Sequence, residues 1–420
     1  MEKDSDCDLI SDLPESIIET ILTKLPIRDA VRTSVISTRW RYRWASMTHL
    51  VFDDRSATDY TDPNTVRDRV ENFVTKFLLL HNGPIHKFSI CSSHLGACPI
   101  DQWLLFISRK DVKEVVIELG EDEWFRAPSC LFSCKNLTGL ELVYCELNPP
   151  PNFKGFPWLK NLNLHQIAIP PDDIECLISS CPLLENLSMS YFDGVELTIR
   201  APNLKYLVLE GEFKDICLAN TPRLVNVSVL MYMTDHIANH FEQSSSCNFD
   251  KFLGGVPKLE RLTGHLYFTK FLSIGNRNER RPMTYHQLKF IELYQVSFED
   301  INEVLVVLKL IVNCPNLKSL QISGSTSAGA RDPDLQFWDK NISEDFTLHE
   351  LKTVKLTDVS GVPLEMRFIK FLLEHSPVLE EMTVTPSSYV TEGRLSMLID
   401  LVSFRRASPQ ASIVFVHKSI

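Results

Sequence analysis

The chain has 420 residues, of which 44% are apolar and 23% are charged, so it has enough apolar side chains for a continuous core. Its formal net charge of −11 disfavours a nucleic-acid partner, because phosphate contacts need lysine and arginine. The acidic first residues lack the apolar segment of a signal peptide, and no apolar run is long enough to span a bilayer. Eleven cysteines at irregular spacings, without Cys-x-x-Cys, predict reduced thiols. We therefore expect a soluble intracellular protein of the nucleus, the cytoplasm or both, with no membrane partner.

Residues 1–8 are polar, and we expect them to be disordered. A first helix is predicted after them, between Pro14, which suits a first helical turn, and Pro26, which ends the helix. The apolar residues of this segment recur on one helical face: Ile17, Ile18, Ile21, Leu22 and Leu25.

Two further short helices are predicted before residue 47. The second has an apolar side that consists of Ala30, Val31, Ser34 and Val35. Ser37 is the expected N-cap of the third, which carries Trp40 and Trp44. Three helices of this size bury little apolar surface alone, so we expect them to complete their packing against a partner protein. Residues 54–80 are expected to form a polar linker and then a helix, from about residue 66, that caps the following domain.

From residue 81 onward the dominant feature is a repeat. Twelve blocks read Leu-x-x-Leu-x-Leu, or a version with Ile, Val, Met or Phe, and their starts lie 20 to 35 residues apart. The clear copies start at Leu137, Leu159, Leu184, Leu204, Leu224, Leu288, Leu317, Leu351 and Leu379, and the weaker ones at Ile85, Val112 and Leu259. Such a period predicts a leucine-rich solenoid, in which each unit supplies one strand and buries its apolar edge only against its neighbours. The expected fold class is α/β: a curved solenoid with parallel strands on its concave face and helices or turns on its convex face.

The intervals between the blocks predict the connections. Three of them carry an apolar stripe at helical spacing that ends in Cys-Pro or Ser-Pro: DDIECLISSC, EDINEVLVVLKLIVNC and EMRFIKFLLEHS. The two intervals of 20 residues are too short for a helix, so we expect irregular or tight helical turns there. Loops are expected at 243–257, 275–282 and 324–334. A helix near residues 395–404 and a strand over residues 412–416 are expected to close the last sheet edge.

The variable positions of each block alternate onto the open, concave face of the strands. Candidate target-binding residues at these positions are Asn161, Asn163, His165, Tyr206, Phe290, Glu292 and Tyr294. Phe290 and Tyr294 are the preferred anchors, because aromatic side chains dominate protein interfaces. A single residue at such a position is more often an ordinary solvated strand residue. The face is mildly acidic, which suits a protein segment better than a phosphate.

No cofactor, metal or catalytic site is expected. Cys181 and Cys314, each before a proline, fit a tight corner as small buried thiols. Other cysteine pairs lack zinc-ligand spacing, and His236 and His240 are not part of a His-Glu-x-x-His motif. The glycine-rich phosphate-binding motifs and G-x-S-x-G are missing, so the chain is expected to bind and not to catalyse.

Residues 9–53 resemble an F-box. The residues that carry this resemblance are Leu13, Pro14, Leu25, Pro26, Ala30, Val31, Thr33, Ser34, Ser37, Arg39, Trp40, Arg41, Trp44, Leu50, Phe52 and Asp53. Arg43 departs from the pattern, since many relatives have leucine before the second tryptophan, and we expect it on a solvated side.

Residues 348–384 resemble an FBD segment: a repeat strand, a turn with glycine, a glutamate before an apolar helix, Ser-Pro, and a second repeat strand. Residues 348–420 are accordingly expected to be FBD-like repeats and a cap, after leucine-rich repeats over 81–347. Together the two resemblances span nearly the whole chain, which is therefore similar to plant F-box proteins with leucine-rich repeats and an FBD segment.

The resemblance implies a non-catalytic, substrate-recognition subunit of an SCF-type cullin–RING ubiquitin ligase. The F-box would bind the Skp-type adaptor, with the cullin and RING subunits beyond it, and the repeats would bind an unknown protein target. The adaptor-binding residues implied are Leu13, Pro14, Ile17, Ile18, Ile21, Leu22, Leu25, Pro26, Val31, Val35 and Trp40. Two alternatives remain: an adaptor-binding scaffold that ubiquitinates nothing, and a hormone-like small-molecule co-receptor, which would need a cavity beneath residues 243–257 or 324–334.

Overall fold

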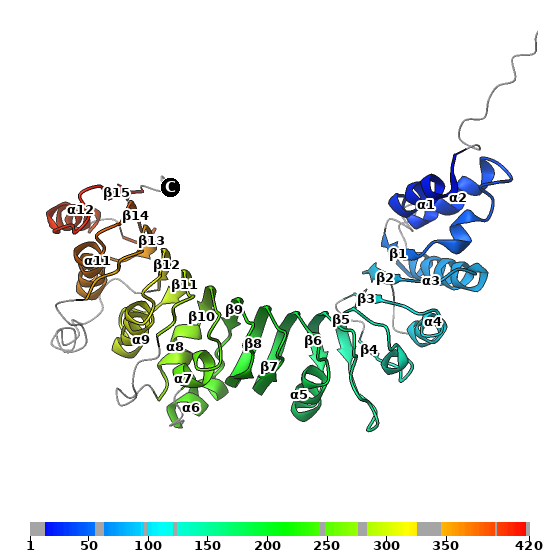
Figure 1. The fold of residues 1–420 in the computed structure, drawn as a ribbon, viewed down its shortest axis with the longest axis horizontal. Coiled ribbons are helices and arrows are strands. Elements are labelled where there is room, and N and C mark those ends of the chain that lie inside the picture. The colour runs from blue at the N-terminus through cyan, green and yellow to red at the C-terminus, as the bar shows by residue number, and fades with distance from the viewer. Residues whose placement is uncertain are drawn as a thin grey trace, which may run out of the picture. The chain divides into compact units, whose positions relative to one another are not determined.

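The computed structural model describes residues 13–54, 63–93, 95, 99–120, 124–243, 248–275, 284–325, 346–390 and 393–416 (Figure 1). The expected disorder of residues 1–8 concerns a segment outside these ranges. The chain divides into two compact units, residues 1–189 and residues 190–420, and each is described by itself.

The first unit begins with the helices predicted before residue 47. Helix α1 spans Glu15–Lys24 and α2 spans Ile27–Arg32. Pro14 and Pro26 are their N-caps, and Leu25 is extended, with a ψ of 146°, because a residue before proline avoids the helical region. The second predicted helix continues past α2 only as the 3-10 turn η1 (Thr33–Val35), and the only helical element within the third predicted helix is the 3-10 turn η2 (Arg43–Ser46).

The expected cap of the third helix is wrong. Ser37 Oγ has no hydrogen-bond partner among the described residues, whereas the Ser37 carbonyl accepts the amide of Trp40 at 3.2 Å. A hydrogen bond between residues i and i+3 closes a tight turn, whereas an α-helix has bonds between residues i and i+4. The turns still bury Trp40 and Trp44, and Trp44 Nε1 donates to Ser34 Oγ at 3.0 Å.

The rest of the first unit is a parallel sheet with helices. Its strands are β1 (His49–Asp53), β2 (Lys87–Ser92), β3 (Glu114–Leu119), β5 (Gly139–Glu146) and β6 (Asn161–Ala168), hydrogen-bonded in that order, and the short β4 (Phe125–Arg126) pairs with β5. Its helices are α3 (Pro63–Leu80), α4 (Ile100–Ile107), η4 (Leu131–Ser133) and α5 (Pro171–Ser179). Strand β7 (Asn186–Arg200) spans the boundary between the units.

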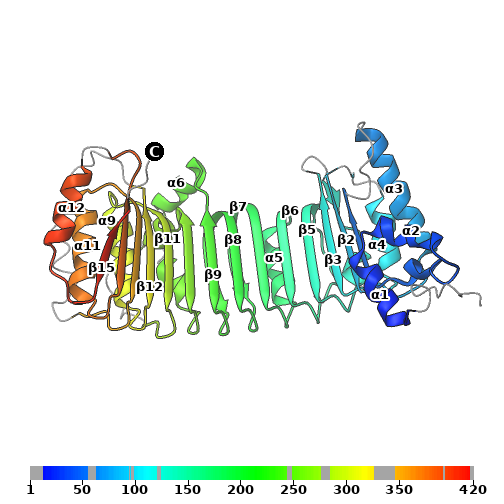
Figure 2. The same cartoon turned by 90° about the horizontal axis from the view of Figure 1, so that it is seen from above.

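The second unit repeats this architecture. Its strands are β8 (Tyr206–Asn220), β9 (Asn226–Met231), β10 (Arg261–Leu266), β11 (Phe290–Val296), β12 (Ser319–Gly324), β13 (Thr353–Val359), β14 (Glu381–Pro386) and β15 (Ser412–Phe415), parallel and in chain order (Figure 2). Its helices are α6 (Asp235–Gln243), α7 (Asn248–Leu253), α8 (Phe268–Ser273), α9 (Ile301–Val312), α11 (Pro363–His375) and α12 (Arg394–Ser403). In Figure 1, α9, α11 and α12 lie along one side of these strands.

All twelve predicted blocks form strands, and each strand begins two residues after the first apolar residue of its block. The block that starts at Leu137 shows the pattern: Leu137, Leu140 and Leu142 are buried, and residues 139 and 141 face outward. Burial of one leucine side chain contributes about 1.5–3 kcal/mol, so the repeated leucines are the main source of stability in the fold.

The two 20-residue intervals differ from the prediction. They contain no helical turns, because β7 and β8 continue as extended strands of 15 residues each. Gly211 in β8 has a φ of +148°, and a Cβ there would lie 2.3 Å from the Phe192 carbonyl oxygen, so this position requires glycine. Helix α7 packs on the second half of β8 through the Lys251–Asp215 ion pair.

Helix α7 also corrects the loop predicted over residues 243–257. Its side chains Phe249, Phe252 and Leu253 are buried, so the short apolar segment belongs to the core. Helices α4, α6 and α8 and strand β4 were likewise not predicted. The other two expected loops lie largely outside the described residues, whereas α3, α5, α9, α11, α12 and β15 confirm the predicted elements.

A buried glutamate connects a strand to the helix after it, twice in the second unit. Glu365 Oε2, at the start of α11, accepts the amides of Ser360 at 2.8 Å and Gly361 at 2.7 Å. Glu303 Oε2, at the start of α9, accepts Thr269 Oγ1 at 2.6 Å and the Ser297 amide at 3.3 Å. Burial raises the pKa of Glu303. Glu365 is the glutamate of the FBD-like pattern, and its role here is to hold the turn that precedes α11.

The N-terminal helices are joined to the first repeat by an aromatic and polar contact. The ring of Trp44 lies 4.9 Å from that of Phe77 on α3, and Phe77 stacks on His81 at 6.1 Å between ring centroids. His81 Nε2 donates to the Met47 carbonyl at 2.8 Å, since a carbonyl oxygen only accepts. Its Nδ1 is buried without a partner among the described atoms, so protonation would place an unpaired N–H in the interior.

We predict that the joint weakens in acid. Burial lowers the pKa of His81 in the folded protein, whereas the same imidazole in the unfolded chain has the usual pKa of about 6.5. As pH falls below about 6.5, the unfolded chain therefore binds a proton at His81 before the folded protein does. The stability present above that pH is therefore lost as pH falls toward the lowered folded pKa. The variant H81Q cannot titrate, and its thermal unfolding midpoint should change less between about pH 7.5 and 5.5 than that of the wild type. H49Q, at an exposed imidazole of β1, serves as the control, and equal pH dependence of wild type and H81Q would contradict the prediction.

Candidate functional site

An exposed apolar face lies on the N-terminal helices. Ile17, which is 45% exposed, and the exposed Ile21 lie on α1, and Val35, which is 89% exposed, lies on η1. Ile36 and Tyr42 are exposed as well and were not predicted. We call these five residues the N-terminal apolar face. Exposed side chains of this size in one short segment indicate a surface that a partner covers.

The other residues implied for adaptor binding divide by burial. Ile18, Leu22 and Trp40 are buried and form the core of the segment itself. Pro14 and Pro26 are exposed, whereas Leu13, Leu25 and Val31 are partly exposed, so these five can still reach a partner.

On the open face of the first unit, polar side chains of neighbouring strands bond to one another. Asn163 Nδ2 donates to Glu141 Oε1 at 3.1 Å, and Asn186 Nδ2 donates to Asn161 Oδ1 at 2.5 Å. The ring of His165 meets that of Tyr144 edge-on at 6.2 Å. The structure therefore brings the three predicted residues of β6 together on one hydrogen-bonding surface.

The open face of the second unit carries a denser cluster around Tyr294. Its ring stacks on His265 with centroids 4.4 Å apart and an interplanar angle of 2°. Its hydroxyl accepts Gln321 Nε2 at 3.0 Å. The Arg261 guanidinium lies 4.4 Å from the centre of the Phe290 ring and pairs with Glu292 at 2.5 Å. We name the six residues the Tyr294 cluster: Arg261, His265, Phe290, Glu292, Tyr294 and Gln321.

The cluster is positioned by the repeat register. Residues Arg261, Phe290 and Ser319 are paired across β10, β11 and β12, and Tyr294 follows Phe290 by four residues as His265 follows Arg261. His265 was missed, although it follows the weak block that starts at Leu259 as Tyr294 follows the block that starts at Leu288, and this shared place was the signal that could have found it. Burial lowers the pKa of His265, which favours the neutral imidazole that stacks on the phenol ring. Tyr206, the remaining predicted residue, is exposed on β8.

Many strands have a residue of positive φ at the same place. The sixth residue of its strand has a positive φ at Tyr144, Gln166, Tyr191, Gly211, Leu266, Gln295 and Asp358. The pairings of β11 with β12 and of β13 with β14 shift register just there, which marks a bulge. A bulge interrupts the regular alternation of a strand and can re-aim the side chain that it carries.

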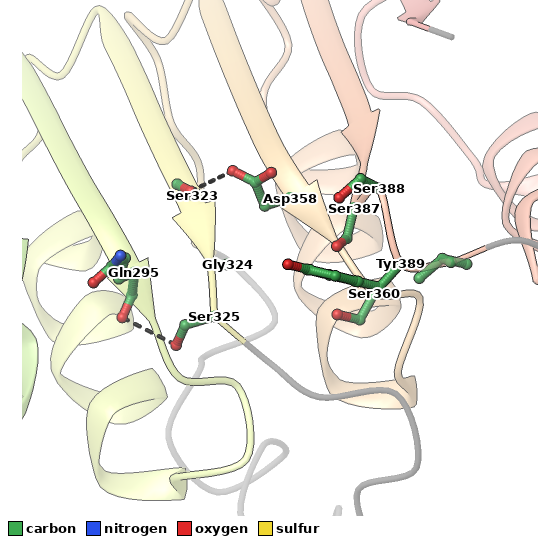
Figure 3. Close-up of a pocket in the computed structure, with 10 residues that line it drawn as sticks. Gln295, Ser323, Gly324, Ser325, Asp358, Ser360, Ser387, Ser388 and Tyr389 are labelled. Carbon is green, nitrogen blue, oxygen red and sulfur yellow. Dashed lines mark hydrogen bonds between the residues drawn. The ribbon is translucent and has the colours of Figure 1, made fainter. Parts of the chain in front are cut away.

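A polar pocket occupies this edge at β11–β14. Gln295 and Asp358 line it from two bulges, and Gly324, at the matching place in β12, leaves room between them. Ser323 Oγ donates to Asp358 Oδ2 at 2.8 Å, and Figure 3 shows the ring of Tyr389 extending between Asp358 and Ser360. The pocket has a volume of about 530 Å³ and is lined by Gln295, Ser323, Gly324, Ser325, Asp358, Ser360, Ser387, Ser388, Tyr389 and Val390.

The pocket has the location that a small-molecule receptor would need. Gly324 and Ser325 belong to the segment 324–334, one of the two segments beneath which a small-molecule receptor would need a cavity, and the remainder of that segment lies outside the described residues. Asp358 is the one charged residue among the ten that line the pocket. This lining offers acceptors and a negative charge, so it suits a ligand with hydrogen-bond donors or a positive charge.

The cysteines have the predicted structural role. Burial raises the pKa of Cys181 to about 11 and that of Cys314 to about 12, so both remain thiols at neutral pH. Across the described ranges no group of three or more potential ligands is placed to hold a metal ion. The side chains of His236 and His240 are outside the described part. No described helix is both long enough and apolar enough to cross a bilayer.

Comparisons with known proteins match this architecture along the chain. A family model described as "FBD-associated F-box protein At5g56370, LRR repeats" matches residues 100–322, more than half of the chain. An F-box domain model matches residues 10–51, and an FBD model matches residues 347–384. The "F-box/FBD/LRR-repeat protein At1g13570" of Arabidopsis thaliana is 53% identical over 97% of this chain and 98% of its own length. The chain belongs to the plant F-box/FBD/LRR-repeat family.

More distant members of the F-box/FBD/LRR-repeat family show the same full-length match. The "FBD-associated F-box protein At5g56370" of Arabidopsis thaliana is 26% identical over 97% of this chain and all of its own length. The resemblance found from the sequence is therefore confirmed, and so is the solenoid fold class. F-box domains in general bind a Skp-type adaptor, so the match over residues 10–51 implies adaptor binding in general.

Proposed function

We propose that this F-box/FBD/LRR-repeat protein is the substrate-recognition subunit of an SCF-type cullin–RING ubiquitin ligase. The observation that carries the proposal is the N-terminal apolar face, because Ile17, Ile21, Val35, Ile36 and Tyr42 remain exposed on a domain whose general partner is a Skp-type adaptor. The cullin and RING subunits join through that adaptor. Leu13, Pro14, Leu25, Pro26 and Val31 supply the margin of the same contact, whereas Ile18, Leu22 and Trp40 support it from inside.

The protein target is proposed to bind the open faces of the repeats. The Tyr294 cluster is the preferred anchor, since stacked aromatic rings and a paired arginine present large contact area at low conformational cost. Hydrogen-bonding groups for the same role are offered by the exposed Asn161 and Tyr206 and by the partly exposed Asn163 and His165.

The proposed mechanism is proximity. The F-box holds the ligase, the repeats hold the target, and the lysine of the target and the ubiquitin thioester meet at a raised effective concentration. This role needs no cofactor and no catalytic residue in this chain, because other subunits perform the covalent chemistry. It also places the protein in the nucleus, the cytoplasm or both.

Two charges on the apolar face test the adaptor contact. The double variant Ile17→Asp, Val35→Asp introduces carboxylates at two exposed positions. We therefore expect the free energy of binding to a recombinant Skp-type adaptor to weaken by about 3 kcal/mol, which raises Kd on the order of 100-fold. Isothermal titration calorimetry measures this change.

The matched control for this test is Leu79→Asp, at an exposed leucine of α3 outside the apolar face. It should leave the adaptor affinity unchanged, and circular dichroism should show native folding of both variants. Adaptor binding that survives the two carboxylates at full strength would refute the F-box contact.

Truncation at the second anchor tests the target surface. Tyr294→Ala removes the stack on His265 and the bond from Gln321, so capture of a direct target should weaken by about 2 kcal/mol, roughly 30-fold. Proximity labelling under proteasome inhibition, scored against the wild type, reports the loss, and adaptor binding is the internal control. An unaltered set of labelled proteins would remove the Tyr294 cluster from target recognition. Labelled proteins that a reconstituted complex fails to ubiquitinate would instead indicate a scaffold.

A second candidate function is a receptor for a small polar ligand, and the pocket at β11–β14 favours it. Ligands of drug-like size occupy cavities of about 300–1,000 Å³, a range that includes this one. Because Asp358 is the single charge in its lining, an ammonium or guanidinium group is the expected ligand chemistry. A carboxylate or phosphate is disfavoured there.

Titration with simple probes tests this chemistry. L-argininamide and L-lysinamide should bind saturably, and Asp358→Asn should weaken them about tenfold, since a charge-assisted hydrogen bond is lost. Acetate and glucose are the comparison probes, and Ser388→Ala is the conservative control within the same lining. Ligand-observed NMR measures the affinities. Equal binding of glucose, or no binding of either cation, would rule out a cation receptor.

A further inference from the structure

The last helix of the second unit has two apolar faces. Met397 and Leu401 are buried on the side that packs against α11. On the other side a stripe is open: Leu395 is 68% exposed, Leu398 38%, Ile399 60% and Val402 69%. We call these four residues the outer stripe. Their spacing of i, i+3, i+4 and i+7 is that of a helix surface which packs on another helix.

The last strand beside this helix also has an open edge. Strand β15 pairs with β14, and no other described strand bonds to its far side. Its residues alternate between exposed and partly exposed, and Val414 is exposed. The strand therefore covers the edge of β14, as expected, but presents a β-rich edge of its own. Soluble proteins normally protect such an edge with charges or a cover.

Strand β15 and helix α12 belong to the same terminal repeat, and Figure 1 shows both at the end of the second unit, beyond β14 and α11. Solenoid ends usually carry a polar outer surface. This end combines an apolar stripe on the helix with unpaired backbone on the strand, two features that call for one covering partner.

We propose that the partner is a second copy of this chain, docked end to end about a two-fold axis. The outer stripe is self-complementary when two copies of α12 run antiparallel: Leu395 lies opposite Val402 of the other copy, and Leu398 lies opposite Ile399. The four positions are symmetric about the midpoint between residues 398 and 399, which is what an isologous contact requires. No charge lies within the stripe, so the pairing brings no like charges together.

The same symmetry serves the strand. An axis that relates two copies of α12 in antiparallel fashion also relates two copies of β15 in antiparallel fashion, so their free edges can hydrogen-bond across the interface. A stable interface buries about 800 Å² per partner, and one helix with a four-residue strand is small by that measure, so we expect a Kd on the order of 10 µM. This association is independent of the adaptor contact and of the target surface.

Sedimentation equilibrium of the full chain between about 1 and 100 µM tests the proposal, because mass action makes association depend on concentration. The wild type should form dimers, and Ile399→Asp, Val402→Asp should raise Kd at least about 100-fold by placing four carboxylates in the contact. The measurement is made with and without a saturating Skp-type adaptor, which covers the N-terminal apolar face in one arm.

Two controls distinguish this interface from association through other exposed apolar surfaces. Leu79→Asp, Leu80→Asp removes exposed leucines from α3, and Ile17→Asp, Val35→Asp alters the N-terminal apolar face. Both variants should still dimerise. A monomeric wild type at the highest concentration, a dimer that survives the α12 carboxylates, or a dimer lost with the F-box variant would each overturn the proposal.

Cysteine pairs test the antiparallel register. Leu395→Cys and Val402→Cys chains, mixed and oxidised, should give a mixed disulfide. Either chain alone should not cross-link at the introduced site, since the two copies of residue 395 are offset by seven residues, about 10 Å along the helix, beyond the reach of a disulfide. Peptide mapping identifies the bond and separates it from one at the exposed Cys176. Cross-linking of each variant to itself, without the mixed bond, would contradict the antiparallel arrangement.

Discussion

The structure depends on one constraint: a repeat cannot bury its leucines unless the next repeat lies against it. The ladder of parallel strands satisfies the backbone amides and carbonyls, and the leucines of neighbouring repeats, such as Leu140 and Leu162, face one another across the β5–β6 pairing. Neither interaction is complete within one repeat. Because the strands must therefore stack, their outward-facing residues form continuous surfaces. The surfaces available for binding thus result from the same stacking that buries the core.

The same constraint explains where the unsatisfied surfaces lie. Within the described residues, exposed large apolar side chains are clustered before the first repeat, on the F-box, and near the last repeat, on α12, while Leu79, Leu80 and Trp158 are exposed between these two places. Each is a position at which stacking stops. At the N-terminal side β1 and α3 take up part of the F-box, through Trp44 and Phe77, and the rest of its apolar side chains stay exposed. Polar and aromatic side chains prevail on the open faces between, where specificity is needed more than area.

The strand positions were predictable because a leucine spacing fixes which side chains point inward, and Phe290, Glu292 and Tyr294 follow from that register. The length of the 15-residue strands β7 and β8 could not be predicted. A 20-residue interval is too short for a helix, but its length does not indicate which structure forms there. The burial of Ile18, Leu22 and Trp40 depends on how three short segments pack against one another. The apolar pattern alone does not show which apolar residues face this internal contact and which face a partner. The residues with positive φ could not be predicted from the sequence. Tyrosine, glutamine and aspartate adopt the left-handed backbone conformation here because the surrounding structure restrains them.

The bulges near the strand ends separate two tasks that a regular strand combines. In an unbroken strand every residue either packs in the core or lies on the open face, so a change of sequence disturbs one or the other. The side chains at the bulges of β11 and β13 do neither, since Gln295 and Asp358 line the pocket instead. These two repeats thus each contain a site at which mutation can alter chemistry while the core and the open face stay unchanged, and a family built on this scaffold can diversify what its members recognise by changing such sites.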